Sequence, residues 1–333
     1  MNKKRELPIA VPEYNTYGHQ IITTAVFAAN PSLKNWSLNR LPLLRCNPDF
    51  LLGLGNSPEV FVSRSGYQDS RQIERKFLSL KFLGNKFHES IRAMIDEDYY
   101  VFFLNMDDSL IRKAHKSHEN IFFRMGVIYG YDQNEKTYSL LSCDEKQNHK
   151  VIKIPQRWLR IPEEEGIDSR MFPTLCAIRP KDITVQLNVR EIYTTLKQYL
   201  DEAEEKYPPF VSTGKVYGNI VHDYIALYLL YIAQKKISYE QIDTKVFRQV
   251  WEHKVGMLER LTVVEDTLHL DHSISDNYRK IVEQAKQMNE QYLSCCQKKN
   301  KKMILELRDL LLEFSKKERS LLAAFIIKME EEL

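Results

Sequence analysis

The chain has 333 residues, of which 43% are hydrophobic, and its 48 Lys and Arg side chains nearly balance its 45 Asp and Glu side chains, leaving a net charge of +3. This composition excludes a disordered chain, and the length favours two domains, each large enough for its own core. So balanced a charge argues against a nucleic-acid partner.

The sequence predicts neither a membrane span nor a signal peptide. The most apolar stretch, residues 224–233, is about half as long as the ~20 residues with which a helix crosses a bilayer. Pro8 and Pro12 interrupt the region that follows the basic N-terminus, where a signal peptide would need an apolar run. The five cysteines lack metal-ligand spacing and predict reduced thiols. We therefore expect a cytoplasmic protein with no membrane contact and no metal site.

Residues 1–180 predict an α+β domain. Apolar residues at helical spacing indicate helices over 18–30, 73–83 and 88–95. From residue 99 to 154, runs of β-branched and aromatic residues alternate with polar turns. This alternation predicts an antiparallel meander with strands over 99–104, 125–131, 137–143 and 151–154.

Residues 181–333 predict an all-α domain. Apolar spacing near 3.6 residues indicates five helices, of which the last two form a hairpin, and a strand is expected only at 184–187. The predicted helices cover residues 189–203, 218–234, 239–261, 275–297 and 301–332.

Three stretches resemble the butirosin-biosynthesis H-like family. Residues 124–132 end in Tyr-Gly-Tyr-Asp after an apolar run, Tyr217-Gly218 precedes an apolar helix, and residues 251–261 carry Glu-His-Lys followed by Met and Arg. The resemblance implies a papain-like domain with an antiparallel sheet. It also implies that a Cys and a His transfer an acyl group from the pantetheine thioester of a carrier protein to an amine. No other cofactor is expected.

The chain departs from this family at the positions that would carry the chemistry. Where the family's helix would open with Cys, the sequence reads Tyr17-Gly18-His19, and where its strand would carry His, it reads Arg124-Met125. The resemblance therefore implies a degenerate site with His19 and Asp144 as catalytic candidates. The candidates for ligand binding are Tyr17, Arg124, Tyr129, Tyr131, His253 and Lys254.

Each of these residues also has a plainer interpretation. His19 can hydrogen-bond a neighbouring loop at the start of its helix, and Arg124 can form an ordinary ion pair instead of clamping a carboxylate or phosphate. His253 and Lys254 can make structural contacts between domains instead of meeting the phosphate of a phosphopantetheine arm. The sequence leaves these alternatives open.

A second cysteine position offers another route to the same chemistry. Cys143 precedes Asp144 and lies six residues before His149, so a relocated Cys–His pair is one interpretation and a buried inert thiol is the other. Cys46 has the same two interpretations.

Three functions follow from the sequence as hypotheses. The first is amide-forming acyl or peptidyl transfer in a bacterial nonribosomal-peptide or polyketide pathway, acting on a carrier-bound thioester. The second is a non-catalytic pseudoenzyme that binds a carrier protein, a peptide or a pathway partner in the ancestral cleft. The third is a self-protection protein that binds a small ligand. The expected partners are an acyl or peptidyl carrier protein and a small amine or peptide, and a homodimer is compatible with the sequence.

Overall fold

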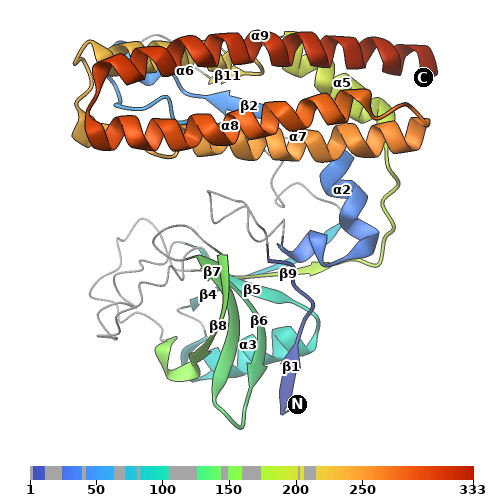
Figure 1. The fold of residues 1–333 in the computed structure, drawn as a ribbon. Helices are drawn as coiled ribbons and strands as arrows, with labels where there is room; N and C mark the ends of the chain where they lie inside the picture. The colour runs from blue at the N-terminus through green and yellow to red at the C-terminus, as the bar shows by residue number, and fades with distance from the viewer. Residues whose placement is uncertain are drawn as a thin grey trace. The chain divides into compact units, whose positions relative to one another are not determined.

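A computed structural model describes residues 3–11, 25–39, 43–63, 72–80, 83–104, 126–143, 149–159, 174–201, 203–205 and 215–333. The protein is α+β and forms two compact units (Figure 1). The first, here called the sheet unit, comprises Met1–Ser37 and Gly66–Gln186. The second, the helical unit, comprises Leu38–Ser65 and Leu187–Leu333. Within the described ranges, every helix is too short or too polar to cross a bilayer.

The sheet unit is built on a seven-stranded antiparallel sheet in the order β4-β9-β5-β6-β7-β8, with β1 paired to β6. The run β5-β6-β7-β8 follows the chain order, which confirms the predicted meander. The strands are β1 Lys4–Glu6, β4 Ile73–Ser79, β5 Tyr100–Leu104, β6 Val127–Asp132, β7 Thr137–Cys143, β8 His149–Pro155 and β9 Thr174–Pro180.

Helix α3 (Phe87–Asp96) confirms the helix that was predicted over 88–95. Its apolar side chains Phe87, Ile91, Met94 and Ile95 are buried together in the core that it shares with the sheet. Of the helix predicted over 18–30, residues 25–28 are helical and residues 18–24 lie outside the described part of the chain.

The helix predicted over 73–83 is wrong, because Ile73–Ser79 forms strand β4. This strand lies at an edge of the sheet and pairs with β9 alone, so most of its side chains are only partly buried. An edge strand of this kind shows little of the apolar alternation that identifies a half-buried strand.

Gly130 gives the Tyr-Gly-Tyr-Asp stretch its close contact with β1. A Cβ atom at Gly130 would lie 2.8 Å from the Arg5 carbonyl oxygen and 2.6 Å from Glu6 Cγ. Real Cβ atoms do not approach backbone so closely, so only glycine lets β1 pair with β6 here. The register between β6 and β7 also shifts between Ile128 and Gly130, as in a β-bulge.

We expect Gly130→Ala to lower the free energy of unfolding by about 1–3 kcal/mol, because β1 must move away from β6 to make room for the methyl group. Urea titration followed by circular dichroism measures the change. Gly55→Ala is the matched control, since nothing lies within 4 Å of a Cβ atom at Gly55. Equal stability of the two variants would contradict the steric argument.

The helical unit contains the five helices that the sequence predicted, with ends that differ by up to seven residues. The largest difference is at the helix predicted over 239–261, which begins later and ends later than expected. The helices are α5 Val189–Asp201, α6 Val221–Ala233, α7 Val246–Leu268, α8 Ser273–Lys298 and α9 Lys301–Glu332. Helices α8 and α9 pack on each other across a short turn, which confirms the predicted hairpin.

The all-α prediction for residues 181–333 is wrong, because the helical unit also holds a four-stranded antiparallel sheet in the order β10-β11-β2-β3. Residues 184–187, which were expected to form a strand, do not. The strands are β2 Leu43–Cys46, β3 Phe61–Ser63, β10 Ala203–Glu205 and β11 Lys215–Tyr217.

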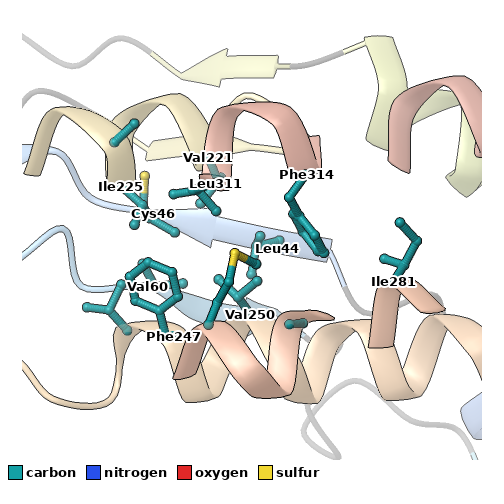
Figure 2. Close-up of a cluster of buried hydrophobic side chains, with 14 of the residues drawn as sticks. Leu44, Cys46, Val60, Val221, Ile225, Phe247, Val250, Ile281, Leu311 and Phe314 are labelled. Carbon is teal, nitrogen blue, oxygen red and sulfur yellow. The ribbon is translucent and has the colours of Figure 1, made fainter. Parts of the chain in front are cut away.

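Strands β2 and β3 come from the first half of the chain, so the expected boundary at residue 180 is replaced by a division that assigns Leu38–Ser65 to the helical unit. The physical reason is burial: Leu44 and Cys46 on β2 are fully buried in the core of this unit. Figure 2 shows both side chains among Ile225 of α6, Val250 of α7 and Phe314 of α9.

The remaining short elements connect these parts. They are helix α2 Lys34–Asn39 and the 3₁₀ turns η1 Pro31–Leu33, η2 Asp49–Leu52, η5 Gly84–Lys86, η7 Gln156–Trp158 and η9 Tyr239–Gln241.

Candidate functional site

Half of the sequence-predicted site lies outside the residues that the structure describes. These are both catalytic candidates, His19 and Asp144, and the ligand-binding candidates Tyr17 and Arg124. Their roles stay predictions.

Tyr129 and Tyr131 lie on β6 and are buried in the sheet unit. The Tyr131 hydroxyl donates a hydrogen bond of 2.6 Å to the Asp96 carboxylate at the end of α3, and burial together with that carboxylate raises the pKa of Tyr131 to about 12. Burial and the charge of Glu6 raise the pKa of Tyr129. Both phenols are therefore neutral at physiological pH and join β6 to its neighbours, while their part in ligand binding stays a prediction.

The register of β7 and β8 places Cys143 and His149 directly opposite each other at the end of the ladder. Cβ atoms of directly opposed residues in an antiparallel pair are about 5 Å apart. His149 is half-buried and lies on β8, at the edge of the sheet. The six-residue spacing in the sequence thus becomes a cross-strand pair, next in sequence to Asp144.

The other four cysteines are held in the neutral thiol form. Burial raises the pKa of Cys46 and of Cys176 to about 12 and that of Cys296 to about 11, and it also raises the pKa of Cys295. Since the thiolate is the nucleophile, none of these four cysteines is suited to acyl transfer. Of the two interpretations of Cys46, the buried inert thiol is therefore the better one.

The helical unit contains a fully buried charged pair, Lys254 of α7 and Glu318 of α9, whose side chains have no exposed surface. Lys254 Nζ lies 2.8 Å from Glu318 Oε2, 2.8 Å from the Tyr199 hydroxyl oxygen and 3.2 Å from His253 Nδ1. These three contacts use all three protons of the ammonium group. Burial lowers the pKa of Lys254, and the nearby Glu318 carboxylate opposes that shift.

Glu318 is the centre of this buried cluster. Its carboxylate also accepts hydrogen bonds from Tyr199 at 3.0 Å, from Asn219 at 3.2 Å and from the Tyr278 hydroxyl. Burial alone would raise the pKa of Glu318, but Lys254 and the hydrogen bonds hold it below the ordinary value. A carboxylate with this many donors stays ionised in the core.

His222 of α6 completes the cluster in its neutral form. Its Nδ1 donates to the Asn219 carbonyl oxygen at 2.7 Å, and its Nε2 lies 3.9 Å from Glu318 Oε2. Burial and the charge of Lys254 lower the pKa of His222 to about 3. Helices α5, α6, α7, α8 and α9 and the turn before α6 therefore each contribute a side chain to this cluster, which surrounds one ion pair inside the helical unit.

Sequence reasoning singled out His253 and Lys254 but missed the residues that surround them. The structure buries both side chains completely, with the ammonium group already paired to Glu318, and any contact with a phosphate stays a prediction. A signal for Glu318 does exist, since it lies on the buried stripe of α9 between Phe314 and Leu322, where a charge is unusual. Tyr199, Asn219, His222 and Tyr278 carried no comparable signal.

No group of three or more His, Cys, Asp or Glu side chains with metal-binding geometry occurs among the described residues. In comparisons with known proteins, the chain matches no protein-family model and none of the curated proteins.

Proposed function

We propose that this protein transfers an acyl or peptidyl group from a carrier-bound thioester to an amine, in a bacterial natural-product pathway, with Cys143 and His149 as the reacting pair. The observation that carries the proposal is the β7–β8 register, which sets these two residues opposite each other. The family resemblance supplies the reaction class, and we further propose a papain-like origin for the sheet unit. Its antiparallel sheet is compatible with that origin.

The reaction would proceed in two steps. His149 takes the proton of the Cys143 thiol, and the thiolate adds to the thioester carbonyl carbon. The bond to the pantetheine sulfur breaks, and that sulfur leaves with the proton from His149. The amine then attacks the protein-bound thioester, forms the amide and gives its proton through His149 to the departing Cys143 sulfur.

Two further observations support this assignment. The four other cysteines have raised pKa values, which argues against each of them as the nucleophile. The edge strand β8 also leaves the His149 side chain half-buried as a whole, with its Nε2 atom buried. A reacting pair needs partial access to a tethered substrate.

We expect intact-mass spectrometry to detect a transferred product after incubation of the protein with a panel of acyl- and peptidyl-loaded carrier proteins and amine acceptors. Cys143→Ser should abolish both the product and any acyl adduct on the chain. His149→Ala should slow transfer by about 100-fold or more, because a general base contributes at least that factor. Cys296→Ser is the matched control, since it removes a thiol of raised pKa from a helix of the other unit.

Each alternative gives a different result. Transfer that survives in Cys143→Ser but is lost in His19→Ala would overturn the Cys143 assignment and favour the site expected at the helix start. A stable complex with a loaded carrier and no product would contradict transfer and favour the pseudoenzyme hypothesis.

A further inference from the structure

Three stretches of the helical unit meet at one end, and we call them together the basic tip: residues 49–57, 235–245 and 298–302. Ser57 Oγ donates to Asp243 at 3.1 Å, and Lys299 forms an ion pair with Glu240. Figure 1 shows the turn between α8 and α9 at the same end of this unit as the connection from α6 to α7. These contacts join the three stretches at one end of the helical unit.

The basic tip concentrates the positive charge of the protein. Its three stretches contain seven lysines against three carboxylates, a net charge of +4, whereas the whole chain has only +3. Six of the lysines are exposed, and they are Lys235, Lys236, Lys298, Lys299, Lys301 and Lys302.

Helix stability does not account for the lysines that open α9. Lys301 and Lys302 are the first two residues of this helix, whose first turn has no acidic side chain. A positive charge at a helix N-terminus opposes the helix dipole, while Lys298, at the end of α8, interacts favourably with it. The only ion pair described for Lys302, with Glu306 at 3.8 Å, is highly exposed and contributes little.

Two leucines add apolar surface to the basic tip. Leu52 and Leu54 are 50% and 57% exposed. Two contacts fix the loop that carries these leucines. Phe50 is buried, with its ring centroid 5.5 Å from that of Tyr231. The Leu54 N–H donates a hydrogen bond to the Asp49 carbonyl oxygen. Lys236 Nζ lies 4.5 Å from the centroid of the same Tyr231 ring, which brings a lysine next to this loop.

We infer that the basic tip docks an acidic protein surface, with Leu52 and Leu54 as the apolar contact and the lysines as its charged surround. This inference rests on the proposed function, under which the acidic partner is the carrier protein that brings the thioester. Exposed lysines around a small apolar centre are the complement of a negatively charged partner with an apolar patch.

The composition of the tip favours a protein over other anionic partners. Two leucines offer far less apolar surface than an interfacial helix inserts into a bilayer. The three stretches contain no arginine, the side chain best suited to bidentate contacts with phosphates and bases. Glu240 and Asp243 would oppose a uniformly anionic surface but can pair with a mixed protein face.

The test measures binding of the full chain to a panel of apo and phosphopantetheine-loaded carrier proteins at 50 and 200 mM salt by fluorescence anisotropy. We expect Lys301→Glu with Lys302→Glu to weaken binding at least tenfold at 50 mM salt, with a smaller loss at 200 mM. The control is Lys316→Glu with Lys317→Glu, which makes the same charge change at exposed positions of the same helix. Acidic residues in the first turn favour α9, so weakened binding would not be a folding defect.

The outcomes separate the two proposals. If the two double variants weaken carrier binding equally, or if neither weakens it, the docking surface is overturned. The transfer proposal is left intact by either result. Loss of product formation in Cys143→Ser with normal carrier binding supports the transfer proposal, and selective weakening of carrier binding by Lys301→Glu with Lys302→Glu supports the docking surface. Absence of binding to every carrier, with binding to vesicles containing 30% phosphatidylserine or to a 20-mer DNA duplex, overturns the protein partner and also removes support from the proposed function.

Discussion

Lys254→Met should lower the free energy of unfolding of the helical unit by about 3–5 kcal/mol. The substitution removes the only ammonium group that contacts Glu318 among the described residues and leaves that carboxylate charged in a core with no exposed surface. Tyr199 loses a hydrogen-bond donor at the same time. Urea titration followed at 222 nm measures the loss, because this unit contains the five long helices.

The pair can be tested as a pair with a double-mutant cycle. Lys254→Met combined with Glu318→Gln should cost less than the sum of the two single changes, because the neutral amide no longer needs a counter-charge. Lys316→Met, on the exposed face of α9, is the control and should change stability by less than about 0.5 kcal/mol. Additive costs in the cycle would contradict direct coupling.

The helical unit should lose stability as the pH falls below 6.5. The pKa of His222 is about 3 in the folded chain and 6.5 in the unfolded chain, so in this window the unfolded chain binds more protons. The free energy of unfolding should therefore fall by up to about 1.4 kcal/mol per pH unit. Below pH 4.5 the lowered pKa of Glu318 adds to the loss, since the unfolded chain also protonates this carboxylate first.

The matched variant is His222→Asn, whose amide can still donate to the Asn219 carbonyl oxygen. Urea titrations between pH 7 and 4.5 should give a shallower slope for this variant than for the wild type. The pKa of His88 in the sheet unit is also lowered, by burial first and by Arg92 second, so some slope remains. Identical slopes in the two proteins would show that His222 is not the titrating group.

Local pattern was enough to predict most of the regular structure. The meander from β5 to β8 was predictable because each strand pairs with its neighbour in sequence. The helices were predictable because each has a continuous apolar stripe. The assignment of β2 and β3 to the helical unit was not predictable in this way. Val216 of β11 pairs with Cys46 of β2 across 170 residues, and nothing local encodes that pairing.

The candidate sites show the same limit. The six-residue spacing suggested a pairing of Cys143 with His149. The β7–β8 register sets the two residues opposite each other because the two strands are adjacent in sequence. The pairing of Lys254 with Glu318 joins residues 64 positions apart and depends on how α7 and α9 pack. The sequence therefore suggested Lys254 as a ligand-binding candidate but could assign neither its burial nor its partner.

The route of the chain through the two units has a consequence for its synthesis. The chain enters the helical unit at Leu38, leaves it after Ser65 and returns at Leu187. Strands β2 and β3 therefore emerge from the ribosome more than 100 residues before the helices that bury them. The helical unit cannot be completed until the sheet unit's part of the chain has been made, so the two units differ in when they can fold. A fragment that begins at Leu187 would lack the two strands that complete its small sheet, and its core would miss Leu44 and Cys46.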